Sequence, residues 1–181
     1  MIYEGKTLLL KDGREAVLRS PKTDDAAQML EYLHTTATET EFVIRYPEEC
    51  DDSEEQESAF LQKVIDSPLN MMIACEIEGK IAGNCQLMLH GRLKTKHRAG
   101  VAIALTREYW GLGIGTAMFE EMIRVAKAHD IHQLELEVIE GNERAMGLYR
   151  KMCFEVVAEK PDAIRLKDGT LLKEFLMIKK L

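Results

Sequence analysis

The chain has 181 residues, 46% of them hydrophobic, with four prolines and a formal net charge of −7. We expect residues 1–181 to form a single domain, since this length is enough to bury a core. The acidic excess argues against nucleic acid as a partner, because binding phosphate backbones requires a surplus of Lys and Arg. No apolar run reaches the ~18 residues of a membrane helix, so we expect no membrane partner.

The cysteines do not have the Cys-x-x-Cys spacing of a metal or redox site; they are Cys50, Cys75, Cys85 and Cys153. The N-terminal residues already show a strand pattern, with no secretory segment before it. We therefore expect reduced thiols, no metal and a cytoplasmic protein. A homodimer is compatible with the sequence.

The first half of the chain predicts hairpins and two helices. Asp12-Gly13 is a two-residue hairpin signal between apolar runs. Ser53 and Gln56 form the pattern of a capping box, which predicts a helix start. Strands are predicted over 6–11, 15–19, 69–77, 80–90 and 96–105, and helices over 23–38 and 53–66.

Residues 48–57 carry seven acidic side chains. Carboxylates complement the positive end of a helix dipole, so we interpret the segment as a solvated helix start. The alternative is a patch that attracts a cationic substrate such as a polyamine.

The central segment predicts a strand, a tight connection and a helix. Val101, Ile103 and Leu105 alternate with alanines, as in a buried strand. Glycines then recur at every second position, at 111, 113 and 115, before a helix predicted over 116–130. Glycine allows a ligand close to the main chain, and a helix start offers free N–H groups. This combination is typical of phosphate binding, although the spacing is neither Gly-x-Gly-x-x-Gly nor a nucleoside-triphosphate loop.

The C-terminal third predicts a strand over 134–138, a helix beginning after Asn142, and strands over 154–158 and 170–179. Asn142 and Tyr149 are seven residues apart, so they point almost the same way, about 10 Å apart along the helix axis. Hairpins followed by a strand–helix–strand unit predict an α+β fold with a mixed sheet.

Two segments resemble motifs of the GCN5-related N-acetyltransferase (GNAT) superfamily. Residues 110–115 are similar to its pyrophosphate loop, Arg/Gln-x-x-Gly-x-Gly/Ala, and residues 142–154 look like its N-x-x-A-x-x-L-Y-x-K-x-G-F segment. Two departures stand out. Trp110 replaces the usual Arg or Gln, which removes one phosphate contact, and Cys153 replaces a glycine, which predicts a different turn.

The resemblance implies a mostly antiparallel sheet of six to seven strands, a splayed central strand pair and about four helices. It also implies acetyl-CoA as co-substrate. The residues expected to contact it are Ile103, Ala104, Leu105, Trp110, Gly111, Leu112, Gly113, Ile114, Gly115, Thr116, Asn142, Ala145 and Tyr149.

By this resemblance, Tyr149 is the catalytic residue that gives a proton to the departing sulfur. A neutral phenol with a pKa near 10 suits an acid working at pH 7. The general base stays open among His97, Glu137, Glu41 and a water molecule.

The resemblance therefore implies an acetyl-CoA-dependent N-acetyltransferase acting by direct attack in a ternary complex. The acceptor is a primary amine of a small molecule, such as an amino acid, or of a protein N-terminus. The whole-chain pattern resembles the bacterial branch that acetylates such amines. The alternatives are a non-catalytic acyl-CoA sensor, a polyamine acetyltransferase, and a nucleotide-binding protein using Glu135 as a ribose contact.

Overall fold

The computed structural model describes residues 1–181 and contains one eight-stranded sheet in the order β1-β2-β3-β4-β5-β6-β8-β7. The strands are β1 (Lys6–Leu9), β2 (Glu15–Arg19), β3 (Asn70–Ile77), β4 (Lys80–Leu89), β5 (Arg98–Leu105), β6 (Gln133–Ile139), β7 (Glu155–Arg165) and β8 (Leu171–Lys180). The α-helices are α1 (Ala26–Glu39), α2 (Glu54–Asp66), α3 (Ile114–Ala128) and α4 (Glu143–Lys151).

The predicted α+β class, mixed sheet and four helices are confirmed. Only β5 and β6 run parallel; every other neighbouring pair is antiparallel. The sheet has eight strands rather than six to seven, because the β1–β2 and β7–β8 hairpins both extend it, one at each edge.

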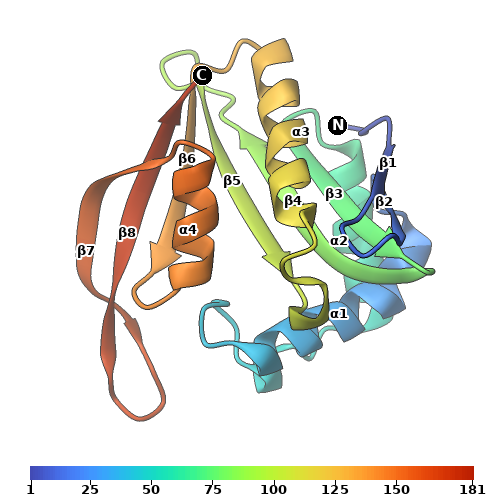
Figure 1. The fold of residues 1–181 in the computed structure, drawn as a ribbon, viewed down its shortest axis with the longest axis horizontal. Coiled ribbons are helices and arrows are strands. Elements are labelled where there is room, and N and C mark those ends of the chain that lie inside the picture. Colours follow the sequence, from blue (N-terminus) through green and yellow to red (C-terminus); the bar gives the residue numbers. More distant parts are fainter.

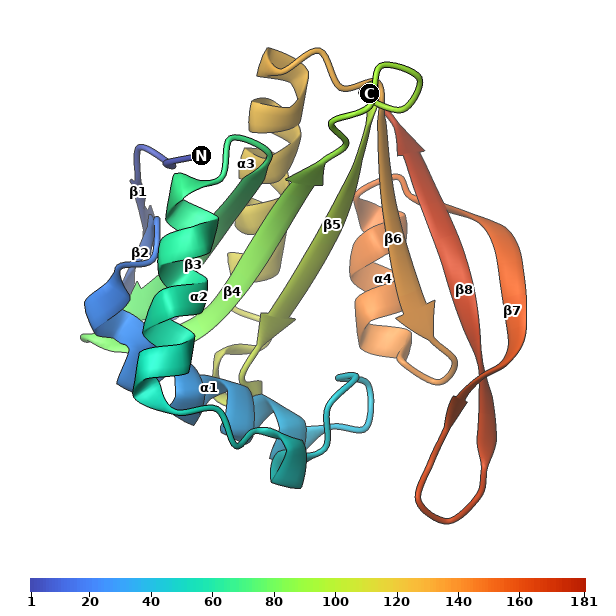
Figure 2. The ribbon, with the colours of Figure 1, turned by 180° about the vertical axis from the view of Figure 1, so that it is seen from behind.

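Two helices cover each face of the sheet. In Figure 1, α3 and α4 lie in front of the strands, and Figure 2 shows α1 and α2 on the opposite face. The larger buried cluster lies on the α3 and α4 side and includes Phe119, Tyr149 and Phe154. A smaller cluster joins α1 and α2 to β3 and β4. None of the helices combines the length and apolar character needed to cross a bilayer.

Strands β5 and β6 pair over a short stretch and then diverge. Their register runs from Arg98 opposite Gln133 to Gly100 opposite Glu135, whereas β5 stays paired with β4 as far as Leu105. Figure 2 shows the two strands meeting near the C-terminus and separating toward the other end. The splayed pair that the resemblance implied is therefore present, and residues 101–105 lack a strand on one side.

A β-bulge lies between β3 and β4, next to the end of β5. Cys75 lies opposite Gly83 but Glu76 lies opposite Ile81, so Ala82 is the extra residue. A Cβ at Gly83 would lie 2.6 Å from the carbonyl oxygen of Ala104, so only glycine lets the end of β5 approach so closely.

The turn after α4 differs from the sequence-based expectation. Cys153 has φ +62, so it adopts the left-handed conformation that glycine usually takes at this position. The N–H of Phe154 donates to the carbonyl of Tyr149 and the N–H of Cys153 to that of Arg150, both at 2.9 Å. This is the ordinary glycine-type helix end, so the expectation of a different turn was wrong. The helix-ending hydrogen bonds and burial of Phe154 hold the turn despite the cysteine.

Candidate active site

A cleft of about 1320 Å³ opens where β5 and β6 diverge. Ordinary small-molecule sites measure roughly 300–1000 Å³, so this one has room for a long ligand together with a second molecule. Most of the expected contact residues line it: Ile103, Ala104, Leu105, Trp110, Gly111, Gly113, Gly115, Thr116, Asn142, Ala145 and Tyr149. The side chains of Leu112 and Ile114 instead pack against the core.

The first turn of α3 presents main-chain donors to the cleft. Gly113 is the N-cap with φ +96 and provides no side-chain acceptor. None of the N–H groups from Gly111 to Thr116 donates to a protein acceptor. Free N–H groups at the positive end of a helix dipole bind phosphate oxygens. The loop can therefore hold a pyrophosphate through its main chain alone.

The third glycine of the loop, Gly115, allows a packing contact between two helices. Gly115 lies inside α3, and a Cβ there would come 2.9 Å from Leu148 Cδ2 of α4. Its small size lets α3 and α4 pack closely, and this places both helices at the same end of the cleft.

Trp110 does not provide a phosphate donor. Its indole N–H donates to the carbonyl oxygen of Leu105 at 2.8 Å. The guanidinium of Arg144, on α4, lies over the indole ring with its carbon 4.5 Å from the ring centroid. Arg107 contacts the same ring at 5.6 Å.

Cationic side chains surround the helix start, although the chain as a whole is acidic. Arg144, Lys151 and Lys11 all line the cleft, and Lys151 Nζ donates to Thr116 Oγ1 at 3.0 Å. Sequence reasoning assigned no role to these three residues. Lys151 occupies the lysine position of the second motif and could have been found there. Lys11 and Arg144 reach the loop only through the fold.

The main chain of β5 is partly engaged. The Tyr32 hydroxyl donates to the Ala104 carbonyl at 3.0 Å, and Trp110 holds the Leu105 carbonyl. The N–H of Thr106 donates to β4 at Ala82. Main-chain groups alternate in direction along an antiparallel strand, so those of Ile103 face the gap toward β6. Of the three expected residues, Ile103 is thus the one whose N–H and C=O are both free for a ligand.

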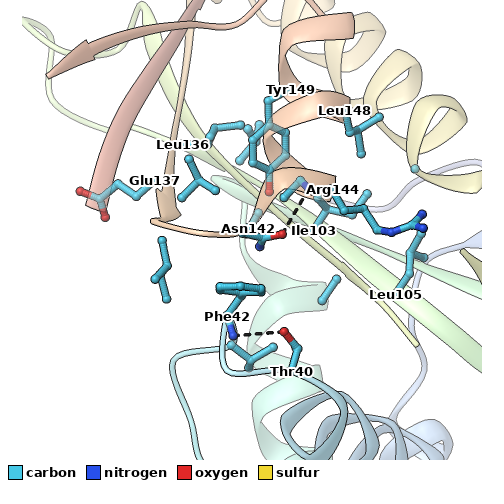
Figure 3. Close-up of a pocket in the computed structure, with 18 of the residues that line it drawn as sticks. Thr40, Phe42, Ile103, Leu105, Leu136, Glu137, Asn142, Arg144, Leu148 and Tyr149 are labelled. Atoms are coloured by element: carbon cyan, nitrogen blue, oxygen red, sulfur yellow. Dashed lines mark hydrogen bonds between the residues drawn. The ribbon is translucent and has the colours of Figure 1, made fainter. Parts of the chain in front are cut away.

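Asn142 performs two functions at the start of α4. Its Oδ1 accepts the N–H of Ala145 at 3.2 Å, which makes it the side-chain cap of the helix. The amide nitrogen is left to donate into the cleft. Figure 3 shows this side chain below Tyr149, between β6 and the loop that carries Phe42.

Tyr149 projects from α4 into the cleft and is 7% exposed. Its ring packs edge-on against Phe119 at 5.6 Å, with Phe154 at 6.3 Å. Burial raises the pKa of Tyr149 to about 12, so the phenol stays protonated throughout the physiological range. Figure 3 shows the hydroxyl directed toward the space between Asn142 and Ile103.

The structure separates the three candidate bases. Glu137, on β6, lines the cleft. His97 lies in the exposed turn before β5, where its carbonyl accepts the N–H groups of His132 and Gln133, and it does not reach the cleft. Glu41 lines a neighbouring hollow instead. Lys160 Nζ donates to Glu137 and, at 3.0 Å, to Glu174 of β8, and these hydrogen bonds raise the pKa of Lys160.

The loop between α1 and α2 forms the other wall of the cleft through Thr40, Phe42 and Ile44. The Phe42 ring would lie 3.6 Å from a Cβ at Gly141, which places the loop against the β6–α4 connection. A second hollow of about 700 Å³ shares these loop residues and continues to the β7–β8 hairpin at Ile164 and Arg165. The open space therefore extends well beyond the end of Tyr149.

The loop and the hairpin contact each other directly. The Tyr46 hydroxyl accepts the main-chain N–H of Lys167 at 3.0 Å, and the Lys167 ammonium lies over the Tyr46 ring and pairs with Glu48. These contacts join segments more than a hundred residues apart in the chain and fix the rim of the second hollow.

The acidic segment 48–57 does not line the cleft. Glu48 pairs with Lys167, Asp52 pairs with Arg45, and the capping box of Ser53 and Gln56 is formed in full. Glu135, the ribose contact of the nucleotide-binding alternative, accepts hydrogen bonds from Arg98 and Gln133, both at 2.9 Å.

Splayed strands beside a helix start with free N–H groups form a site for a long, phosphate-bearing ligand, and Tyr149 places a proton donor in the same cleft. The Acetyltransferase (GNAT) family profile matches residues 30–154, and the chain belongs to this family.

Several relatives agree with this assignment. The chain is 29% identical, over 51% of its length and 59% of the other's, to a candidate ribosomal protein bS18-alanine N-acetyltransferase of Bacillus subtilis. It is 28% identical to an N-alpha-acetyltransferase of Sulfurisphaera tokodaii, over 81% of this chain and 84% of the other. A GNAT-family acetyltransferase from Streptococcus pneumoniae superposes with a TM-score of 0.84 at 26% identity, covering 92% of this chain and 99% of that one. The chain spans under two thirds of the Bacillus relative. Family membership and these named relatives support an N-acetyltransferase.

Some solved structures of this fold contain acetyl-CoA. A phosphinothricin acetyltransferase from Sinorhizobium meliloti, 18% identical with a TM-score of 0.78 over 92% of this chain and 88% of that one, was solved in complex with acetyl-CoA. At this level of identity the likeness shows a shared fold.

Proposed function

We propose that this protein transfers the acetyl group of acetyl-CoA to a primary amine bound in the same cleft. The observation that carries this proposal is the run of free N–H groups from Gly111 to Thr116, set beside the splay of β5 and β6. The first feature suits a pyrophosphate and the second suits an extended arm that pairs with the Ile103 main chain. The donors, the open strand edge and the cleft volume all fit acetyl-CoA.

The chain's own groups then have distinct roles. The Ile103 N–H and the Asn142 amide hold and polarise the bound thioester. The amine nitrogen attacks the carbonyl carbon, a C–N bond forms and the C–S bond breaks. The departing sulfur takes the proton of Tyr149, whose raised pKa keeps that proton available at neutral pH. Solvent afterwards reprotonates the phenolate.

We propose Glu137, directly or through a water, as the group that removes the amine proton. It is the candidate base that lines the cleft. Its hydrogen bond to Lys160 ties it to the β7–β8 hairpin, so Lys160 must release it when an acceptor ammonium arrives.

The second hollow favours an acceptor larger than a free amino acid. An amine placed near Tyr149 leaves the space between the α1–α2 loop and Ile164 unfilled. The α-amino group of a protein N-terminus, with its following residues in that hollow, would occupy both. The two curated relatives whose names specify protein or N-alpha acetylation support this choice.

The test is a panel of acceptors made of amino acids, polyamines and short peptides. Turnover is measured as the release of free thiol from acetyl-CoA. We expect turnover with peptides that have a free α-amine and none with the same peptides blocked at that amine. Preference for free amino acids would leave acetyl transfer in place but contradict the protein acceptor. Stoichiometric binding of acetyl-CoA without turnover on any amine would favour the non-catalytic sensor.

A further inference from the structure

A cation that no sequence motif specifies, Arg144, lies against the loop that leads into α3. Trp110 has no charge, and its only side-chain donor, the indole N–H, is used on the Leu105 carbonyl at 2.8 Å. That hydrogen bond fixes the indole plane. Arg144 extends from α4 across the ring face, 4.5 Å from its centroid, and both residues line the cleft together with Gly111 and Gly113. Figure 3 shows the Arg144 side chain reaching from α4 toward Leu105.

We propose that Arg144, held against the Trp110 ring, binds the pyrophosphate of acetyl-CoA and completes the donor set that the α3 N–H groups begin. This inference rests on the proposed function. A guanidinium forms paired hydrogen bonds to two phosphate oxygens, and its flat face stacks on an aromatic ring. Stacking orders the side chain before the ligand arrives, so less conformational entropy is lost on binding.

Arg144 is the arginine in the cleft that is free for this role. Arg107, the other arginine on the Trp110 ring, donates to the main-chain carbonyl of Glu39. Arg144 makes neither a salt bridge nor a hydrogen bond within the protein, in a chain whose net charge is −7. An unpaired guanidinium in the cleft that also contains the free N–H groups can bind an anion. Trp110, on which Arg144 stacks, directly precedes Gly111, and this places Arg144 at the proposed pyrophosphate loop.

The test compares dissociation constants of three ligands: coenzyme A, dephospho-coenzyme A without the 3′-phosphate, and pantetheine without any phosphate. Calorimetry serves the first two and NMR titration the third. We expect Arg144→Ala to weaken the first two by about tenfold, which corresponds to 1.4 kcal/mol, and to leave pantetheine unchanged. Arg150→Ala is the matched control, since Arg150 is exposed on the same helix and does not line the cleft.

A second variant tests the role of the ring. Trp110→Leu should weaken coenzyme A severalfold, but should have little further effect in the Arg144→Ala background, because the two residues act as a unit. Full additivity of the two losses would show that the ring does not position Arg144.

Each other result has a definite meaning. Unchanged affinity for coenzyme A in Arg144→Ala, or an equal loss for pantetheine, overturns the inference. A loss for coenzyme A that is absent for dephospho-coenzyme A assigns Arg144 to the 3′-phosphate and overturns it too. If the unmodified protein binds none of the three ligands, the proposed function fails; if it binds them and Arg144→Ala binds equally well, only this inference fails.

Discussion

Helices α2 and α3 begin in opposite ways. At α2, Ser53 Oγ accepts the N–H of Gln56 at 3.3 Å, and Gln56 Oε1 accepts the N–H of Ser53 at 2.7 Å, so the helix satisfies its own first donors. At α3, Gly113 caps nothing and the first N–H groups donate to no protein atom. Unsatisfied donors at a helix start lower the stability of the free protein. The N–H groups that α3 leaves without a protein acceptor are therefore available for a ligand.

Helix α4 lies between these two cases. Asn142 caps it through Oδ1, as Ser53 does for α2, yet the amide nitrogen of the same side chain stays available to the cleft. The helix then contributes side chains, Arg144 and Tyr149, rather than main-chain donors. One cleft is therefore built from an uncapped helix that binds through its backbone and a capped helix that binds through its side chains.

A substitution at Gly113 should remove the difference between the two helix starts most completely. A Cβ at this position would meet only Lys11 Cε at 4.0 Å, so Gly113→Val fits the free protein apart from its φ of +96. The new side chain would occupy the space through which phosphate reaches the N–H groups. We expect the variant to show no acetyl-CoA-dependent rise in Tm, where the unmodified protein shows one.

Gly169→Val is the control for this change. Gly169 has φ +90 and nothing within 4 Å of its Cβ, so the backbone strain is comparable but the site is a hairpin turn. Its acetyl-CoA shift should be intact. A full shift in Gly113→Val would show that the α3 start does not bind the co-substrate.

The largest catalytic effect is expected from Tyr149→Phe on the capped helix. The change removes a proton donor and leaves the packing on Phe119 in place, so kcat should fall by about 10²–10⁴ with little change in acetyl-CoA affinity. Because the pKa of Tyr149 is raised to about 12, the phenol is protonated at every pH from 6 to 9. The fall should therefore be constant across that range in steady-state kinetics.

Tyr109→Phe controls for removal of a tyrosine hydroxyl from an equally buried position outside the cleft. It should retain activity. Full activity of Tyr149→Phe between pH 6 and 9 would make Tyr149 a core residue only.

Substitution of Asn142 by Asp and by Ala separates its two functions, helix capping and donation into the cleft. Asp is as good an N-cap as Asn but has no amide donor, so Asn142→Asp should keep its Tm and raise the KM for acetyl-CoA about tenfold. Asn142→Ala loses the cap as well and should cost about 1 kcal/mol of unfolding free energy. Thermal unfolding and acetyl-CoA saturation curves measure both. An unchanged KM in the Asp variant would leave Asn142 as a cap alone.

The smallest effect is expected at the acidic start of α2. Replacing Glu48, Glu49, Asp51 and Asp52 with their amides removes the ion pair to Lys167 and should lower stability slightly. These charges lie outside the cleft, so kcat/KM for the best amine should stay within about threefold, below the tenfold that 1.4 kcal/mol would produce. A larger fall, limited to multiply charged amines and abolished by high salt, would show that the segment steers the acceptor.

Local patterns predicted most of the elements. The Asp12-Gly13 turn, the capping box of α2 and the strand alternation at 101–105 each depend on neighbours in sequence, and each is present. The glycine-rich loop was also predictable, because glycine is the residue type that readily adopts φ above zero, as Gly111 and Gly113 do.

The sequence could not predict which residues the fold would bring to that loop. Lys11 comes from a hairpin a hundred residues away in the sequence. Arg144 stands at a position of its motif where no residue type is specified. His97 was one of the candidate bases, but β5 begins after it, at Arg98, and His97 does not line the cleft. Gly115 was read as part of the phosphate loop, whereas its closest constraint is Leu148, a packing contact that exists only in three dimensions.

Strands β5 and β6 are joined by three residue pairs, and this short pairing has a mechanical consequence. The two halves of the sheet are joined there by a short seam, so we expect the amide protons of β5 that face the gap to exchange with solvent although the strand lies mid-sheet. A bound pantetheine arm would hydrogen-bond along that edge as an additional strand does. The co-substrate would then act as a structural element that couples the two halves, and their opening fluctuations would slow when it binds.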